Sequence, residues 1–497
     1  MKHSEIDFRY TMTFSQCVHG MYDEKMEAVY RKYSQNASFE ENSESTFYVM
    51  GEINMQIQLS EHFTFKKLLR FVLPSIVMMI FTSIYNVVDG LFVSNFAGKT
   101  ALAAINLIVP LLMGLSALGF MIGTGGSAIV AKTLGEGKKK EANEYFSMLI
   151  YITAAGGIVL SIIGAFLTPT IASMLGARGQ LLSNCTMYAR ISFISMPAFM
   201  LQNVFQSFFV AAEKPKLGLS VIVASGVTNI ILDALFVGAF GFGLAGAAAA
   251  TVCGELLGGI IPIIYFSRKN SSLLRLCKTR INISVFIKTC VNGSSELMTN
   301  LSSSIVNSLY NVQLIKFAGE NGVAAYGTIM YVNFIFVAIF FGYSIGSAPL
   351  ISFNYGAGNH DELKNLFKKS MTLVTVWGIL LAIISQIIAM PLARLFVGYD
   401  NELLAMTQEG FRIYCLVYLI NGFNIFGSAF FTSLNNGIIS AIISFLRTLV
   451  FQIVSVIILP IIFGIKGIWF AVIVAEMFTL CFTAAFLIKQ RHNYHYV

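Results

Sequence analysis

The segment PSIVMMIFTSIYNVVDG, residues 74–90, decides the class of this protein. It is a continuous apolar run that places one carboxylate, Asp89, among side chains suited to hydrocarbon. Acidic residues within membrane segments are costly and rare, and they usually face a protein interior where they mark an ion or substrate pathway. Asp89 is therefore the first candidate functional residue. Pro74 lies on the same predicted helix, lacks a backbone donor, and is the candidate hinge.

The composition indicates a polytopic membrane protein. The 497 residues are 56% hydrophobic and 12% charged, whereas soluble proteins carry about 25% charged residues. The net charge of +8 is explained by basic cytoplasmic loops and does not indicate nucleic-acid binding. The seven cysteines are scattered singly, so neither a disulfide framework nor a zinc site is predicted.

Residues 1–62 form a polar N-terminal extension that we expect to be disordered or weakly helical. They lack the basic start and short apolar core of a signal peptide. Met50 or Met55 is an alternative natural start, because the sequence that follows already resembles a short lead-in to the first helix. Deletion of residues 1–49 tests this alternative, since loss of membrane insertion would show that the extension matters.

Twelve apolar runs are long enough to cross a hydrocarbon core of about 30 Å at ~1.5 Å per residue. Lys and Arg cluster in alternate loops, which predicts that both termini are cytoplasmic in a multi-pass protein of the cell (inner) membrane. The expected spans are 68–92, 104–131, 145–167, 186–210, 217–238, 244–266, 292–317, 324–352, 370–391, 411–434, 437–463 and 467–488.

The two halves of the chain repeat. Leu102-Ala103-Ala104 recurs as Val323-Ala324-Ala325, and Glu255 recurs as Glu476, at a spacing of about 220 residues. Six spans per repeat leave both halves in the same orientation, as expected for two bundles around a central cavity. We therefore expect an all-α fold of two pseudo-symmetric six-helix bundles. The predicted domains are an N-lobe (63–266), a cytoplasmic linker (267–291), a C-lobe (292–488) and a cytoplasmic tail (489–497).

A set of polar residues breaks the repeat. Asp89 corresponds to Tyr310, and Asp233 corresponds to Val454, so only the first half carries the two acids. Oxygen ligands at a similar depth suit a small cation, or a pair of acids that shares a proton. We expect one acid to be protonated when the cation is absent; the alternative is a polar cluster that only holds the bundle together. The candidate coupling-ion site, for Na+ or H+, is Asp89, Asp233, Asn229, Thr251 and Tyr188.

Further polar residues are candidates for a substrate cavity. Glu255 and Glu476 either bond to a neighbouring helix or face the cavity, and Glu296 lies in serine-rich surroundings that suit close packing or a water-lined wall. We assign Glu296, Glu255, Asn203 and Tyr310 to this candidate cavity. No phosphate-binding loop occurs, so we expect an ion gradient as the energy source, no cofactor and no enzymatic activity.

The motifs taken together resemble the MATE (multidrug and toxic compound extrusion) family of the prokaryotic type. They are Pro74 with Asp89, Gly98 with Leu102-Ala103-Ala104, NIILD at 229–233 and ATVCGE at 250–255. The resemblance extends over about residues 63–488, and it implies two six-helix lobes that open alternately to export organic cations against an inward flow of Na+ or H+.

The resemblance also implies residue roles. Asp89 resembles the family's coupling-ion acid, with a possible Na+ at Asp89 and Asp233, and Pro74 resembles the proline at which the first helix bends. The seventh span departs from the family, since Ser303 stands near the usual place of an acid and Glu296 lies two turns earlier.

The predicted function is therefore antiport of cationic or amphipathic compounds, with a role in antibiotic resistance. We expect a monomer that contacts the lipid bilayer and small organic cations, and no nucleic acid. The alternative is a flippase for lipid-linked oligosaccharides, which needs basic residues in its cavity. No Lys or Arg lies centrally in the spans of the first half, whereas Arg447 in span 11 is a candidate. An ion channel or a receptor is a poor fit, because the sequence has two repeats and no filter-like loop.

Overall fold

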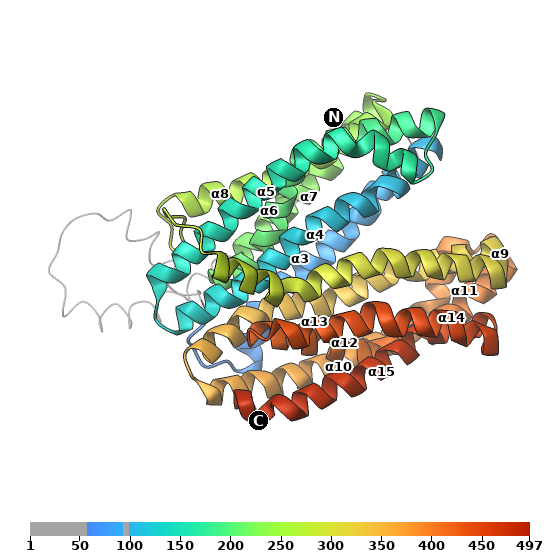
Figure 1. Ribbon diagram of the computed structural model, residues 1–497. Helices are drawn as coiled ribbons and strands as arrows, with labels where there is room; N and C mark the ends of the chain where they lie inside the picture. The colour runs from blue at the N-terminus through green and yellow to red at the C-terminus, as the bar shows by residue number, and fades with distance from the viewer. Residues whose placement is uncertain (1–56, 93–98) are drawn as a thin grey trace, which may run out of the picture. The chain divides into compact units, whose positions relative to one another are not determined.

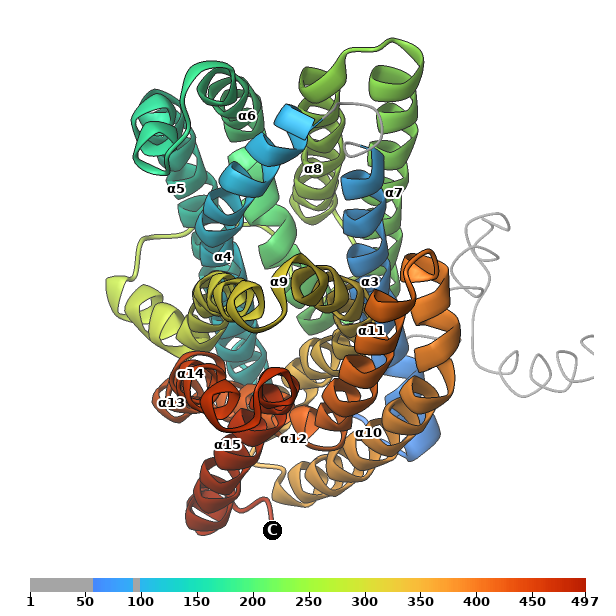
Figure 2. The same cartoon turned by 90° about the vertical axis from the view of Figure 1, so that its right-hand side faces the viewer.

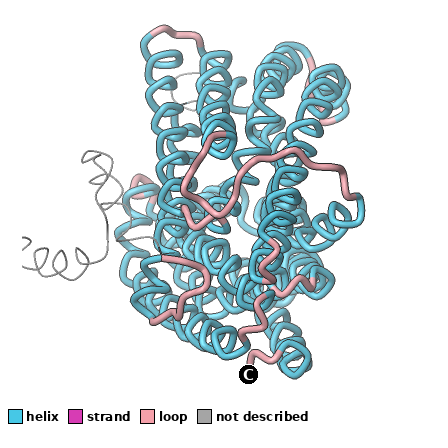
Figure 3. The backbone as a smooth tube through the Cα atoms, turned by 90° about the vertical axis from the view of Figure 1, so that its left-hand side faces the viewer, coloured by secondary structure: helices cyan, strands magenta, loops and turns pink. Residues whose placement is uncertain are grey.

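The computed structural model describes residues 57–92 and 99–497, and most of the expected N-terminal extension lies outside these ranges. The described residues form helices joined by loops, without a strand (Figure 3). The first half contains α3 (Phe65–Phe92), α4 (Lys99–Gly135), α5 (Lys139–Met174), α6 (Gly179–Ala211), α7 (Pro215–Asp233), η2 (Ala234–Ala239) and α8 (Gly243–Ser267). The second half contains α9 (Ile283–Gly356), α10 (His360–Val397), α11 (Asn401–Tyr414), η3 (Cys415–Val417), α12 (Tyr418–Ser433), α13 (Gly437–Phe445), η4 (Leu446–Val450), α14 (Phe451–Phe463) and α15 (Ile465–Tyr494).

Eleven helical segments of the described chain are long and apolar enough to cross a membrane. One of them, α9, is 74 residues long and contains two of the expected spans. Its backbone leaves the helical region at Gly319, with φ 62° and ψ −151°, a conformation that glycine adopts readily. Divided there, α9 supplies two passes, so the prediction of twelve transmembrane helices in two six-helix bundles is confirmed (Figure 1).

The connection between the halves is shorter than the expected linker. Helix α8 ends at Ser267 and α9 begins at Ile283, inside the range 267–291. Asn282 caps α9, since its side-chain oxygen accepts a hydrogen bond from the backbone N–H of Val285 at 3.3 Å. The start of α9 therefore extends the seventh span by two to three turns.

Helix α9 joins the two halves, packing against α3 and α4 on one side and α12 and α13 on the other (Figure 2). Glycines permit the closest backbone approaches. A Cβ atom built on Gly293 would lie 1.9 Å from the carbonyl oxygen of Met121, and one on Gly342 would lie 2.5 Å from Cα of Ile76. Small residues at such positions let membrane helices approach closely. These contacts lie in the first half of α3 and the second half of α4. We call the end of the molecule where α3 begins and α4 ends the closed end.

Gly293→Ala is expected to destabilise the protein because its methyl group has no space between α9 and α4. Overpacking of this kind costs about 1–3 kcal/mol. Gly327→Ala in the same helix is the matched control, because a Cβ atom there meets nothing within 4 Å. Size-exclusion chromatography after heating measures the effect. Equal survival of the Gly293→Ala protein and the control would contradict the close approach.

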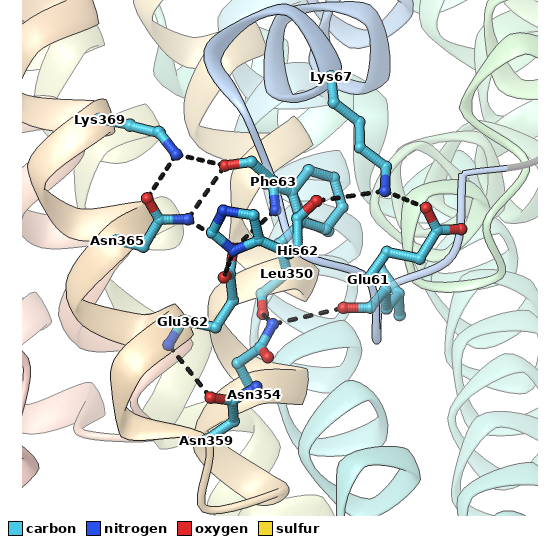
Figure 4. Close-up of polar contacts among 11 residues, drawn as sticks. Glu61, His62, Phe63, Lys67, Leu350, Asn354, Asn359, Glu362, Asn365 and Lys369 are labelled. Carbon is cyan, nitrogen blue, oxygen red and sulfur yellow. Dashed lines mark hydrogen bonds and ion pairs between the residues drawn. The ribbon is translucent and has the colours of Figure 1, made fainter.

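A short lead-in segment, Ile57–Thr64, precedes α3 and links the two halves (Figure 4). In the first half, the Leu59 N–H donates to Oε1 of Glu213 at 2.6 Å, in the turn after α6. In the second half, Asn354 near the end of α9 donates to the carbonyl of Leu59 at 3.4 Å. Burial raises the pKa of the Glu213 carboxyl, while its bond to the Leu59 N–H acts in the opposite direction.

The strongest anchor of the lead-in segment is Glu362 in the first turn of α10 (Figure 4). Its carboxylate, only 5% exposed, accepts from the Phe63 N–H at 3.0 Å and lies 2.5 Å from Nδ1 of His62. Asn365 and Lys369 on the same helix donate to the Phe63 carbonyl. Both backbone groups of Phe63 are thereby satisfied by one face of α10, which fixes the start of α3.

Glu362→Ala is expected to release the lead-in segment, because the buried Phe63 N–H loses its acceptor. Hydrogen exchange in a peptide covering residues 57–64 should accelerate at Phe63 by about tenfold or more. Glu402→Ala, in the exposed first turn of α11, is the control and should leave this peptide unchanged. Unaltered exchange in the Glu362→Ala protein would show that the carboxylate does not hold the segment.

Candidate functional site

The structure brings the two predicted acids of the first half together. Asp89 lies near the end of α3, and Asp233, which is 0% exposed, ends α7. Helix α7 packs closely on α3, since a Cβ atom on Gly226 would lie 2.6 Å from the ring of Phe81. The carboxyl groups of Asp89 and Asp233 are near enough to interact electrostatically. The π-helical turn η2 begins directly after Asp233, and such turns often occur at functional sites.

The oxygen atoms of this acid pair are poorly satisfied by the protein. Asp89 Oδ1, both carboxyl oxygens of Asp233 and Asn229 Oδ1 are buried without a hydrogen-bond partner among the described residues. Buried polar atoms are nearly always hydrogen-bonded, so four in one place require an explanation. Asn229 donates to the Thr251 hydroxyl at 3.5 Å, and Thr251 donates to the Ala247 carbonyl at 3.1 Å. Thr251 therefore keeps one free oxygen lone pair beside the acids.

This oxygen set fits a small cation or a proton. The set offers two carboxylates, an amide oxygen and a hydroxyl. Hard cations prefer such oxygen ligands to nitrogen or sulfur. Within residues 57–92 and 99–497, no group of three or more His, Cys, Asp or Glu side chains that could hold a metal ion is found. The candidate site consists of Asp89 and Asp233, with Asn229 and Thr251 beside them.

Sequence reasoning missed some neighbours of Asp89. Glu255, assigned to the substrate cavity, lies instead near Asp89 and accepts a hydrogen bond from the Ser195 hydroxyl at 2.5 Å. Tyr85 on α3 and the buried Tyr188 on α6 both interact electrostatically with Asp89 and Glu255. Tyr188 was predicted at this site; Tyr85 lies four residues before Asp89, on the same face of α3, which is the signal that could have found it.

The three acids at this site, Asp89, Asp233 and Glu255, form no ion pair with a described basic residue. None of the ion pairs formed by the described residues includes Asp89, Asp233 or Glu255. Isolated ionised carboxylates are strongly disfavoured in a medium of low dielectric constant. The three groups must therefore be neutralised by protons or by a bound cation.

In the second half, Glu476, the repeat mate of Glu255, is paired with a basic residue. Nε of Arg447, which is 8% exposed, lies 2.8 Å from Oε1 of Glu476, and Nη2 donates to Asn421 at 2.7 Å. Asn424 donates to the other carboxyl oxygen of Glu476 at 2.6 Å. The repeat places Gly226 where the second half has Arg447. The two halves thus differ in how their buried charge is balanced.

A pocket of about 540 Å³ of empty space lies between the two halves. It is lined by Glu296 of α9 and Arg447 of η4, together with Thr124 and Ser127 of α4 and other hydroxyl-bearing residues. The pocket therefore lies where side chains from both halves meet.

Two residues assigned to the substrate cavity do not line this pocket. Asn203 is buried in α6 and donates to the Ser116 carbonyl at 3.3 Å. Tyr310 is stacked on Tyr326, with ring centroids 4.9 Å apart, and donates to Gln452 at 3.1 Å. Both side chains pack between helices and form hydrogen bonds there. Of the four residues assigned to the cavity, Glu296 lines the pocket.

Similar proteins of known fold match most of the chain. A MATE transporter crystallised in the straight conformation has a TM-score of 0.83 at 21% identity, covering 88% of this chain and 98% of that one. An outward-facing multidrug resistance MATE family transporter of the MOP superfamily has a TM-score of 0.79, also at 21% identity, with the same coverage. At this identity the likeness shows the fold.

Curated relatives match over nearly their whole length. The multidrug export protein MepA of Staphylococcus saprophyticus is 25% identical over 432 residues, which cover 85% of this chain and 93% of MepA. MepA of Staphylococcus haemolyticus is also 25% identical, over 443 residues. The MatE family model matches residues 74–235 and again residues 297–458, once in each half. On these matches, the chain belongs to the MatE family of membrane transporters.

Proposed function

We propose that this protein is a multidrug efflux transporter that exports organic cationic or amphipathic compounds in exchange for Na+ or H+. Its relatives in Staphylococcus are named multidrug export proteins. The observation that carries the coupling proposal is the group of buried acids without a basic partner in the first half, Asp89, Asp233 and Glu255.

Coupling follows from the balance of charge at these acids. When the site holds a Na+ ion or a proton, the buried negative charge is neutralised; when the cation leaves, that charge must be exposed to water or to the substrate. A ligand shifts a conformational equilibrium only through its different affinity for the two states. The coupling cation should therefore favour one arrangement of α3 about Pro74, and the substrate should favour the other.

The proposed orientation places the closed end in the cytoplasm. The lead-in segment and the loops that carry most of the Lys and Arg residues lie at this end, as the positive-inside rule requires of cytoplasmic loops. Both termini would then be cytoplasmic. With the cytoplasmic end closed, the conformation described here would be the one that releases substrate to the outside. The pocket at Glu296 would be the last site the substrate occupies before the halves close behind it.

Observations on Arg447 weaken the flippase alternative. A flippase for lipid-linked oligosaccharides needs an available cation for the phosphate group, whereas Arg447 is already bonded to Glu476 and Asn421. A phosphate at Arg447 would have to compete with a buried carboxylate 2.8 Å away.

Transport of a fluorescent cation in proteoliposomes, with Na+ and H+ gradients imposed separately, tests the proposed function. We expect one of the two gradients to drive accumulation of the dye. Dissipation of that gradient should stop transport, while the other gradient should have no effect. Failure of both gradients to drive transport of any organic cation would reject the proposal.

A further inference from the structure

The pocket between the halves presents hydrogen-bond acceptors rather than an aromatic surface. Thr124 donates its hydroxyl proton to the Phe120 carbonyl at 2.9 Å, and Thr299 donates to the Ser295 carbonyl at 2.8 Å. A hydroxyl group has one proton and two lone pairs. Because each proton is used within the residue's own helix, Thr124 and Thr299 offer the pocket only lone pairs.

The same reasoning applies to other lining residues. Ser127 donates to the Thr124 carbonyl at 3.1 Å, so its oxygen is also left as an acceptor. Ser207 and Ser344 differ from these residues: they are nearly fully buried, and their hydroxyl groups have no hydrogen-bond partner in the described part of the chain, so each can donate as well as accept. Glu296 adds a carboxylate, which accepts hydrogen bonds and does not donate when ionised.

The charge of the pocket follows from its two ionisable residues. Arg447 lines the wall, but Glu476 lies 2.8 Å from it and balances its charge. Arg447 also interacts electrostatically with Glu296, although no ion pair joins Glu296 to a described residue. With Glu296 ionised, one guanidinium faces two carboxylates, which leaves one excess negative charge. The pocket is therefore suited to one positive charge that carries several N–H donors.

We infer that the pocket selects substrates whose positive charge bears N–H donors, such as guanidines, amidines and primary amines, over quaternary ammonium compounds of similar size. This inference rests on the proposed function and names its substrate class. A quaternary ammonium group has no N–H and can meet Glu296 only as a point charge. It would leave the acceptors at Thr124, Ser127 and Thr299 without donors, after excluding water from them.

Binding of two matched probes to the full-length protein in lipid nanodiscs tests the inference. Hexylguanidine and hexyltrimethylammonium carry the same alkyl chain and the same charge, but only the guanidinium group has N–H donors, five in number. We expect hexylguanidine to bind at least about tenfold more tightly, since a single hydrogen bond to a charged group is worth that factor. Equal affinity, or binding of neither probe, would overturn the inference.

Isosteric variants locate the selectivity. Thr124→Val and Thr299→Val keep the volume and remove the hydroxyl, so each should weaken hexylguanidine binding about tenfold and leave hexyltrimethylammonium unchanged. Thr299→Ser, which keeps the hydroxyl, should restore binding. Thr153→Val is the control, because the buried Thr153 donates to the Leu149 carbonyl at 2.8 Å and does not line the pocket. Equal losses for both probes would assign the threonines to packing and reject the inference.

The outcomes separate this inference from the proposed function. Ion-driven transport of a quaternary dye, together with no preference for hexylguanidine, would leave the function intact and overturn the selectivity. Selective binding of hexylguanidine that depends on Thr124 and Thr299, without transport under either ion gradient, would support the pocket and reject ion-coupled efflux.

Discussion

Asp89→Asn is expected to abolish ion-driven transport while leaving a folded protein in the membrane. The substitution keeps the size of the side chain and removes the charge that a cation or proton would neutralise. Because none of the ion pairs of the described residues includes Asp89, its amide variant breaks no salt bridge. We expect transport to fall by at least about 100-fold, the scale of a lost buried charge interaction.

The control for this prediction is Asp361→Asn. Asp361 is an exposed acid in the first turn of α10, outside the membrane-spanning core, so its amide variant should transport normally. Thermal stability, compared by size-exclusion chromatography, separates a loss of function from a loss of fold. Normal transport by the Asp89→Asn protein would remove Asp89 from the coupling mechanism.

The second large effect concerns stability. Arg447→Met is expected to destabilise the protein by about 3–5 kcal/mol, because it leaves the Glu476 carboxylate buried without its partner. The double variant Arg447→Met/Glu476→Gln should recover most of this loss, since it removes the uncompensated charge and keeps groups that can bond to Asn424. Heat-induced loss of the folded peak in chromatography measures both proteins.

The double variant distinguishes two explanations. If Arg447 stabilises through charge compensation, the second substitution rescues the first. If Arg447 acts only by filling space, Glu476→Gln should give no recovery. A single variant as stable as the unmodified protein would contradict the assignment of this buried pair.

The helices could be predicted from the sequence because the membrane imposes both length and apolar composition. The run expected at 437–463 coincides with the segment that begins at α13 and ends at α14. The continuity of α9 could not be predicted, because a turn at Gly319 and a loop of several residues leave similar gaps in hydropathy. The start of α9 at Ile283 lies within INISVFIKTCV, residues 281–291, a segment whose sequence suits both an amphipathic helix on the inner leaflet and a solvated linker.

The candidate ion site was predicted from broken symmetry. Asp89 and Asp233 stood out because the second half carries Tyr310 and Val454 at the equivalent positions, and the structure brings the two acids together. Comparison of the two repeats could not single out Glu255, because the equivalent residue in the second half, Glu476, is also an acid. The difference between them lies in a third residue, Arg447, which contacts Glu476 from another helix. Neither periodicity nor spacing encodes such a contact.

In the proposed mechanism, an exchangeable cation neutralises the buried carboxyl groups of Asp89, Asp233 and Glu255. Infrared difference spectroscopy of the purified protein measures this most directly, because protonated carboxyl groups absorb apart from carboxylates. We predict a protonated carboxyl signal in the absence of Na+ that disappears at high pH or on addition of Na+, and that is weaker in both the Asp89→Asn and the Asp233→Asn proteins. A spectrum without such a signal, combined with no measurable binding of Na+, would contradict the account.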